Sequence, residues 1–320
     1  MRTGLRAGLR SGARARGFTL VEAVLVIAIV GIIGAIVAVF IRAPILNYRD
    51  MADRAELTDQ ADLALRRMAR DIRLALPNSV RVSADGSALE LLQTRSGARY
   101  LADDDGVDPG LVLSFGDAAK TSFTALAPPT TFAQVRAGDY VVVYNLGDGY
   151  EPANAYALAA TGVSGCPASG GASATGAGNI AMICALTPAT DNIGGQDVPT
   201  VHLTLAANPF ALQEIALQSP QRRFQVVSGP VGFYCAAQPD GTLALWRVWG
   251  YPIAATQAIP VGGQRALVAT RLTHCGGLFS YGSAAAQRSG LVGIALELHG
   301  RNDSASAIRL VHQVHVDNTP

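Results

Sequence analysis

A stretch near the amino terminus, residues 16–41, reads RGFTLVEAVLVIAIVGIIGAIVAVFI. Its last part, AVLVIAIVGIIGAIVAVFI at 23–41, carries no charge and is rich in β-branched side chains. A helix of this length crosses a hydrocarbon core of roughly 30 Å, so the segment predicts a membrane helix. A cleaved secretory signal is the alternative, but it needs a shorter apolar region followed by a small-residue cleavage site. The tripeptide Arg42-Ala43-Pro44 follows instead, which favours a retained helix.

The charges are distributed unevenly along the chain. The whole chain has 25 basic and 24 acidic residues, and a net charge of +1 gives no general attraction to nucleic acid. Removing the five basic residues that precede Glu22 leaves 20 basic and 24 acidic residues, a formal charge of −4. The positive-inside rule therefore predicts a cytoplasmic N-terminus and a head on the other side of the membrane. The five basic residues are Arg2, Arg6, Arg10, Arg14 and Arg16.

The junction before the apolar run reads Arg16-Gly17-Phe18-Thr19-Leu20-Val21-Glu22. It resembles the type IV pilin and type II secretion pseudopilin superfamily, whose basic class III leader ends in glycine and precedes Phe-Thr-Leu-x-Glu. The resemblance implies that residues 1–17 are a leader, cut after Gly17 by a prepilin peptidase on the cytoplasmic side. It also implies methylation of the new amino terminus, Phe18, and retention of the apolar helix.

Glu22 places a carboxylate near the start of a membrane helix, which is unfavourable unless a partner compensates the charge. The resemblance implies that this partner is the Phe18 ammonium of a neighbouring subunit, and that the pair sets the axial register of a filament. Alternatively, Glu22 is a solvated acid at the headgroup interface that favours the helix start. The complete flanking motif favours the role in assembly.

The helical pattern continues beyond the apolar run. Residues 18–42 form the predicted transmembrane half of the helical segment, and residues 43–77 form its amphipathic half. The predicted helix runs from Phe18 to Leu76, and Pro77 and Asn78 end it. The charged face of the amphipathic half is acidic in its first part and basic in its last turns, where positive charge is favourable to the helix dipole. The apolar stripe is Tyr48, Met51, Ala55, Thr58, Ala61, Leu65, Met68, Ile72 and Ala75.

Gly31, Gly34 and Pro44 weaken the predicted helix, because glycine costs backbone entropy and proline removes a hydrogen bond. The two glycines also permit close packing between membrane helices. The superfamily resemblance favours the other interpretation, in which this stretch melts locally on assembly.

Residues 78–320 show short apolar runs between turn signals, with no alternating helices. This pattern predicts a large antiparallel β-rich head, and hence an α+β protein. Hairpin turns are predicted at Asp85-Gly86, Pro239-Asp240-Gly241 and Asn302-Asp303. The predicted strands are Val80–Val82, Leu89–Leu92, Tyr140–Tyr144, Val201–Leu205, Phe224–Val227, Leu243–Trp249, Leu291–Leu298 and Ile308–Val316.

Four cysteines, Cys166, Cys184, Cys235 and Cys275, lack the close spacing of zinc ligands. An even number in an exported head indicates disulfides, and three connectivities are possible. We favour Cys166–Cys184 and Cys235–Cys275, since each closes a local excursion without crossing the other. The Cys166–Cys184 disulfide would crosslink the Gly-, Ser- and Ala-rich loop Gly165–Asn179 to the rest of the head.

No catalytic constellation is apparent, so the sequence predicts neither an enzyme nor a cofactor. His312 and His315 lie three apart on a predicted strand and face opposite sides, so they do not converge on a metal. The acidic run Asp103–Asp108 is the best calcium candidate. In an EF-hand register its end positions are Leu101 and Val112, which offer no side-chain oxygen. A solvated acidic turn is therefore expected, and no metal site.

Three further stretches resemble minor pilins of the mannose-sensitive haemagglutinin (MSHA) pilus, of the MshO type: ALRRMARDIRLALPNSVRV at 64–82, GPVGFYC at 229–235 and RLVHQVHVDNTP at 309–320. The resemblance implies a minor pilin that primes or caps filament assembly. Its partners would be other major and minor pilins, the prepilin peptidase, the inner-membrane assembly platform and the lipid bilayer. It would cross the inner membrane once, with a periplasmic head, before entering the pilus. The alternatives are a type II secretion minor pseudopilin and a tip adhesin or other binding module.

Overall fold

The computed structural model describes residues 17–163, 165–168, 173–281, 290–300 and 307–320, apart from the side chains of residues 42–47 and 104. The leader residues 1–16 and the predicted turn at Asn302-Asp303 lie outside this part of the chain. The chain divides into two compact units, one that ends at Asp53 and one from Arg54 to Pro320. An N-terminal apolar helix precedes a large antiparallel sheet, which confirms the α+β class.

Helix α1 (Leu20–Arg73) ends three residues before the predicted end at Leu76. The amide of Leu76 donates to the Leu92 carbonyl at 2.8 Å, and the amide of Thr94 donates to the Leu74 carbonyl at 2.8 Å. The chain therefore leaves the helix early because strand-like hydrogen bonds to the neighbouring strand satisfy its backbone groups.

The strands of the described head form one 12-stranded sheet, and every pairing between named strands is antiparallel. Four short 3-10 helices connect some of them: η1 (Asp103–Asp105), η2 (Pro129–Phe132), η3 (Ala155–Thr161) and η4 (Pro209–Leu212). The strands are β1 (Arg81–Val82), β2 (Ala88–Tyr100), β3 (Ser122–Leu126), β4 (Tyr140–Val142), β5 (Ile180–Ile193), β6 (Gln196–Leu205), β7 (Arg223–Ala237), β8 (Leu243–Trp249), β9 (Gln264–Leu272), β10 (Phe279–Ser280), β11 (Leu291–His299) and β12 (Ala307–His315).

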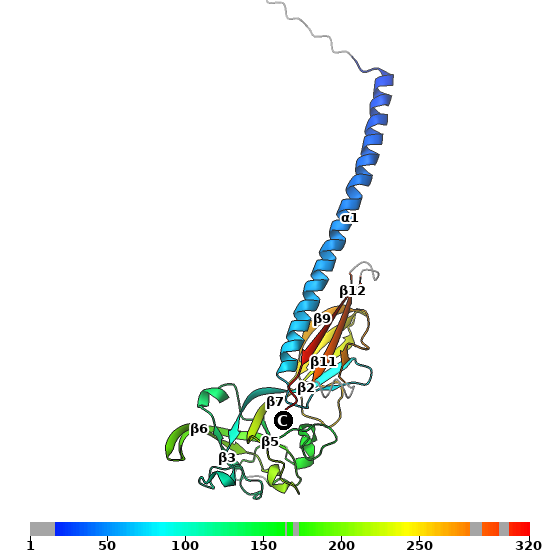
Figure 1. The fold of residues 1–320 in the computed structure, drawn as a ribbon. Helices are drawn as coiled ribbons and strands as arrows, with labels where there is room; N and C mark the ends of the chain where they lie inside the picture. The colour runs from blue at the N-terminus through cyan, green and yellow to red at the C-terminus, as the bar shows by residue number, and fades with distance from the viewer. Residues whose placement is uncertain (1–16, 164, 169–172, 282–289, 301–306) are drawn as a thin grey trace, which may run out of the picture. The chain divides into compact units, whose positions relative to one another are not determined.

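One part of the head, which we call the helix–sheet lobe, packs the residues of α1 from Arg54 onward against a sheet that includes β8, β9, β11 and β12 (Figure 1). Strand β11 alternates between buried and half-buried positions, as expected for a sheet covered on one face by a helix. The α1 residues of this core are Leu57, Ala61, Ala64, Leu65, Met68, Ala69 and Ile72.

The other part, which we call the closed lobe, is a ring of six strands. The pairings run β2-β3-β6-β5-β4-β7, and pairing of β7 with β2 closes the ring. Side chains fill its interior, as in other small barrels. Phe224 lies at the centre of an aromatic group, 5.3 Å from Phe123 and 6.3 Å from Phe132 between ring centroids.

Strands β2 and β7 belong to both lobes. Residues Ala88–Leu92 of β2 pair with Pro230–Tyr234 of β7 in the helix–sheet lobe, and Thr94–Arg99 pair with Arg223–Val227 in the closed lobe. The register shifts between Leu92 and Ser96, where the pairing passes from one lobe to the other. A bulge of this kind bends a strand, so it allows two long strands to serve two differently curved sheets.

Each of the eight predicted strand segments overlaps an observed strand. The predicted turns at Asp85-Gly86 and Pro239-Asp240-Gly241 join β1 to β2 and β7 to β8, with positive φ at Gly86 and Gly241. Four strands were missed: β3, β5, β9 and β10. Strand β5 contains Pro188 and the turn-forming pair Asp191-Asn192, and β9 has four consecutive exposed residues at its start, so neither shows a clear strand pattern.

Candidate functional site: the N-terminal motif

The predicted cleavage site lies directly before α1. Gly17, Phe18 and Thr19 are non-helical and exposed, with 76% of Phe18 accessible. The backbone amide of Glu22 donates to Thr19 Oγ1 at 3.2 Å, and the amide of Ala23 donates to the Thr19 carbonyl at 3.1 Å. Thr19 is therefore the N-cap of α1, and Glu22 is the acidic residue of its first turn.

This role of Thr19 was not among the predictions from sequence, although the sequence contains a signal for it. Thr19-Leu20-Val21-Glu22 has the Ser/Thr-x-x-Glu spacing of a capping box before an apolar run. The cap holds Glu22 at the start of the helix, where its carboxylate is favourable to the helix dipole. The motif thus places the helix start, the acidic residue and the predicted new amino terminus within five residues.

The first unit exposes a continuous apolar surface. Leu20–Ile41 is long and apolar enough to cross a membrane, and its side chains are not buried by the described chain. A Cβ built on Gly31 or Gly34 meets no atom within 4 Å, so both positions are open to a neighbouring helix. Helix α1 is continuous through Gly31, Gly34 and Pro44, and local melting at these residues stays a prediction for the assembled state.

The structure contains the two disulfides of the favoured connectivity, Cys166–Cys184 and Cys235–Cys275. Cys184 lies on β5 of the closed lobe, and Cys166 belongs to the loop Gly165–Asn179, of which residues 169–172 lie outside the described part. Cys235 lies on β7 and is buried, whereas Cys275 precedes β10. Each lobe therefore has one covalent crosslink.

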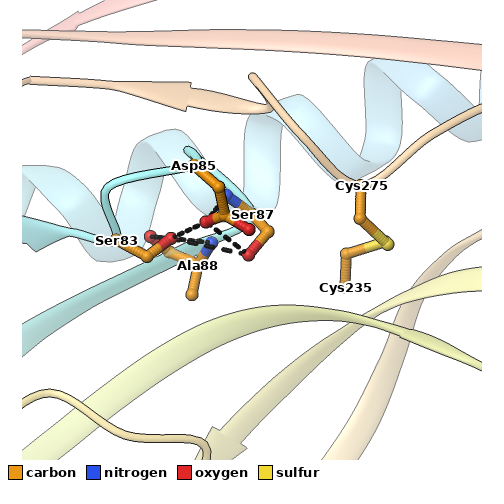
Figure 2. Close-up of a disulfide and its surroundings, with 6 residues drawn as sticks. All are labelled: Ser83, Asp85, Ser87, Ala88, Cys235 and Cys275. Atoms are coloured by element: carbon orange, nitrogen blue, oxygen red, sulfur yellow. Dashed lines mark hydrogen bonds between the residues drawn. A yellow bond between two sulfur atoms is a disulfide. The ribbon is translucent and has the colours of Figure 1, made fainter.

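The second disulfide lies beside the turn between β1 and β2 (Figure 2). In this turn Ser83 Oγ and Ser87 Oγ donate to Asp85 Oδ1 at 2.7 and 2.8 Å, and the amide of Ala88 donates to Ser83 Oγ at 2.9 Å (Figure 2). The bonds that Asp85 accepts from Ser83 Oγ, the Ser87 amide and Ser87 Oγ lower its pKa from 3.8 to about 2, because they favour its charged form.

Backbone hydrogen bonds attach the same turn to the segment after Cys275. The amide of Gly277 donates to the Asp85 carbonyl at 2.8 Å, and that of Phe279 donates to the Gly86 carbonyl at 2.9 Å. Gly86 has φ 70°, and an added Cβ would lie 2.7 Å from the Phe279 carbonyl oxygen, so glycine is required. The turn and the disulfide together connect β1, β2, β7 and β10.

The candidates for metal binding have other roles in the structure. Asp105 accepts from the Ala102 amide at 2.9 Å and forms an ion pair with Arg222, and Asp108 accepts from the Gly110 amide at 2.7 Å. His312 is half-buried and His315 is exposed, on opposite faces of β12. In the described part of the chain, no three His, Cys, Asp or Glu residues are placed to hold a metal ion.

A pocket of about 520 Å³ lies between the segment after α1 and the loop before η3. Most of its polar lining bonds to other protein groups. Arg81 donates to Glu90 and to the Ala254 and Ala255 carbonyls and stacks over the Tyr156 ring at 3.7 Å. These contacts indicate a mainly structural role.

A family model described as "Prokaryotic N-terminal methylation motif" matches residues 12–38. Neither a curated protein nor a solved structure was found to match the chain. The motif suggests a structural, non-enzymatic protein, and together with the apolar helix it fits a membrane-anchored pilin. The matched residues contain the N-cap, Glu22 and most of the apolar span, and they support a type IV pilin-like protein of the pilin and pseudopilin superfamily.

Proposed function

We propose that this chain is a minor pilin of the MSHA biogenesis type, which primes or caps a type IV pilus. The observation that carries the proposal is the methylation motif at residues 12–38, joined to a single apolar helix and a sheet-rich head. The proposed parts are a leader at 1–17, a transmembrane half-helix at 18–42, an amphipathic half-helix at 43–77 and a head at 78–320. The leader is cytoplasmic and the head is periplasmic until the subunit enters the pilus.

The proposed chemistry belongs to the processing enzyme, and this chain supplies the substrate. The peptide bond between Gly17 and Phe18 is in an exposed, non-helical segment, so a peptidase can reach an extended backbone there. Cleavage leaves Phe18 with a free ammonium group, four positions before the carboxylate of Glu22. In the apolar stack of neighbouring helices, this ammonium neutralises the Glu22 carboxylate of an adjacent subunit. Other pilins and the assembly platform are the remaining partners.

The first test is the mass of the mature chain. We expect the membrane form to begin at Phe18 and to carry one methyl group on its amine, as read by intact-mass analysis of the detergent-extracted protein. Replacing Gly17 with a bulky residue should leave the precursor uncut, whereas Gly17→Ala should retain partial cleavage. A mature chain that begins after residue 41 would refute the proposal, because the apolar helix would then be a removed signal.

The second test separates assembly from folding. Glu22→Gln removes the charge at nearly constant shape, so incorporation into filaments should fall while the head keeps its disulfides and melting temperature. The Phe18 ammonium of an adjacent subunit then lacks its anion, and an unpaired charge in lipid costs several kcal/mol. Asp50→Asn is the matched control, since it makes the same change in α1 beyond the apolar span. Normal incorporation and filament number with Glu22→Gln would refute the pairing, as expected for a first subunit without a predecessor.

A further inference from the structure

Strand β12 forms a long free edge of the sheet. It pairs with β11 over nine residue pairs without a bulge, and it pairs with no other strand of the described head. A strand paired on one side only directs every second pair of N–H and C=O groups away from its partner. The strand order of the sheet otherwise ends at β1 and β10, which have two residues each and offer little free edge. Strand β12 is therefore the edge that has room for a further strand.

This edge lacks the features that usually prevent further pairing. Proteins protect an edge with proline, lysine, a bulge or a charge that points inward. Strand β12 contains no proline and no lysine, and its one arginine, Arg309, lies on the exposed face. Ile308 and Leu310 face the core but are only half-buried, whereas the core-facing residues of β11 are all buried. The apolar core is thus incompletely covered along β12.

A groove of about 480 Å³ lies at the same edge, between β12 and the last turns of α1. Of the described strands, only β12 lines it, through His312. Leu65 and Ala69 are its buried lining residues. Asp62 and Leu74 line it as well. Three exposed arginines of α1 complete the lining, one per helical turn: Arg66, Arg70 and Arg73.

The arginines give this groove a net positive charge. Asp62 Oδ2 lies 2.7 Å from Arg66 Nε, but these side chains are 50% and 76% exposed, so water screens the pair. Arg70 and Arg73 have no hydrogen bond or ion pair with any residue that the structure describes. The helix dipole explains positive charge at the end of α1, but it does not explain why Leu74 lies among the arginines with 45% of its surface accessible. Unpaired arginines beside an exposed apolar side chain indicate a surface that an acidic and apolar partner covers.

We propose that β12 binds an extended segment of another protein as an added strand of the sheet, with acidic side chains that pair with Arg70 and Arg73. In this mode of recognition, main-chain hydrogen bonds to the free edge give affinity and every second side chain gives specificity. Those side chains of the added strand point to the same face as Ile308, Leu310 and His312, and hence into the groove. Apolar ones cover Ile308 and Leu310, and acidic ones neutralise the arginines.

A second copy of this chain is a poorer occupant. Strand β12 contains no acidic residue, so two such edges placed together bring Arg309 and the groove arginines of both copies to one interface. Like charges at a pairing interface are destabilising. The occupant is therefore a different protein. The proposal goes beyond the proposed function, because it uses contacts of the head and requires neither cleavage after Gly17 nor the pairing of Glu22.

Photo-crosslinking from the full-length chain in its native cells tests the pairing directly. A photoreactive side chain replaces Arg309, Val311 or Gln313, which lie on the exposed face of β12, so the groove is left unchanged. We expect each variant to crosslink to one other protein, with the crosslinked site on that protein moving by two residues from one variant to the next. The control places the same side chain at Leu267 of β9, which is 42% exposed and separated from β12 by β11, and should give no such crosslink.

A movement of two residues per position is the pattern of a paired strand, and capture of a protein without this pattern overturns the proposal. Crosslinks within the same chain or to a second copy also overturn it, as does the absence of a crosslink at all three positions. A synthetic peptide of the crosslinked segment should bind the purified full-length chain in detergent. The same peptide with a central proline should bind about fivefold more weakly, because proline removes a ladder hydrogen bond. Equal binding of the two peptides overturns the added strand.

Charge reversal tests the acidic character of the partner. Arg70→Glu should lower the crosslinking yield from position Val311 about fivefold, because it places a carboxylate against the acidic segment. Arg67→Glu makes the same change at an exposed residue of α1 that does not line the groove, and it should leave the yield unchanged. Intact disulfides and an unchanged melting temperature check that both variants fold.

A compensating change in the partner completes this test. Replacing an acidic residue of the crosslinked segment with arginine should restore the yield in the Arg70→Glu chain, because the ion pair is re-formed with opposite polarity. Equal yields from the Arg70→Glu and Arg67→Glu chains, or no recovery with the compensating change, overturn the acidic partner.

Discussion

The helix–sheet lobe and the closed lobe bury their cores in different ways. In the helix–sheet lobe, the apolar stripe of α1 covers one face of a sheet, and strands such as β11 alternate in burial. In the closed lobe, the sheet closes on itself and fills its interior with aromatic residues. The first lobe depends on a helix that also contains the apolar span Leu20–Ile41, whereas the second depends on pairings between strands of the head alone.

The two lobes are nevertheless joined by the strands they share. Because β2 and β7 run through both, neither lobe can lose these strands without disrupting the other. The head is therefore expected to unfold as one cooperative unit although it has two main cores.

The largest effect is expected from Phe224→Ala, which removes a buried aromatic side chain from the closed lobe. The cavity should lower the free energy of unfolding by about 3–5 kcal/mol. Both tryptophans, Trp246 and Trp249, lie on β8 in the helix–sheet lobe. Tryptophan fluorescence and far-UV circular dichroism should therefore shift to the same lower urea midpoint. Ile215→Ala, at a side chain 75% exposed, is the control and should change stability by less than about 0.5 kcal/mol.

A fluorescence midpoint that stays at the wild-type value while the dichroism midpoint falls would show that the lobes unfold separately. Met68→Ala provides the reciprocal test in the helix–sheet core. It should cost about 2–5 kcal/mol and should also lower both midpoints together.

The next effect concerns the disulfides, one in each lobe. Replacing Cys235 and Cys275 by alanine releases a loop with a sequence separation of 40, and replacing Cys166 and Cys184 releases one of 18. Chain entropy predicts losses of about 4 and about 3 kcal/mol, because the longer loop gains more freedom when unfolded. Urea unfolding of the two double variants under non-reducing conditions measures the difference. A larger loss for the Cys166–Cys184 variant would mean that strain or residual structure outweighs loop length.

The smallest effect concerns the pH dependence of the helix–sheet lobe. The folded pKa of Asp85 is about 2, below its ordinary value of 3.8. Its carboxylate therefore stabilises the fold above pH 4, and this contribution is lost as the pH falls from about 4 to about 2. Asp85→Asn should show a smaller loss of stability across that window, as measured by urea midpoints at pH 5 and 2.5. Asp148→Asn, at an exposed carboxylate without a hydrogen bond among the described residues, should keep the wild-type pH dependence.

Part of the helix–sheet lobe was predictable from local pattern, although its strands β9 and β10 were missed. Strand β8 was predicted at its observed limits, and β11 and β12 to within one residue, because their apolar runs lie between clear turn signals. Strands β3 and β5 of the closed lobe were not predicted. The residues of β3 alternate poorly, and its partners β2 and β6 lie beyond any short window of sequence. Strand β5 forms a hairpin with the next strand, β6, but Pro188 and the pair Asp191-Asn192 obscure its strand pattern.

The candidate site was predictable to a greater extent than the head. Gly17, Phe18 and Glu22 follow from a contiguous motif, and Thr19 could have been found from its capping spacing. The groove of about 480 Å³ between the last turns of α1 and strand β12 was not predictable, because it depends on His312 lying beside residues that are more than 230 positions earlier.

The sequence by itself determined the apolar helix, its cap, the motif at its start and the α+β class, because each depends on residues within a few turns of one another. The tertiary structure alone decided the ring closure of β2 with β7 and the early end of α1. It also decided the burial of Glu90, which is 2% exposed and bonded to Arg81, Tyr234 and Tyr251. These features depend on which distant strands meet, and that is set by the packing of the whole head, not by any local preference.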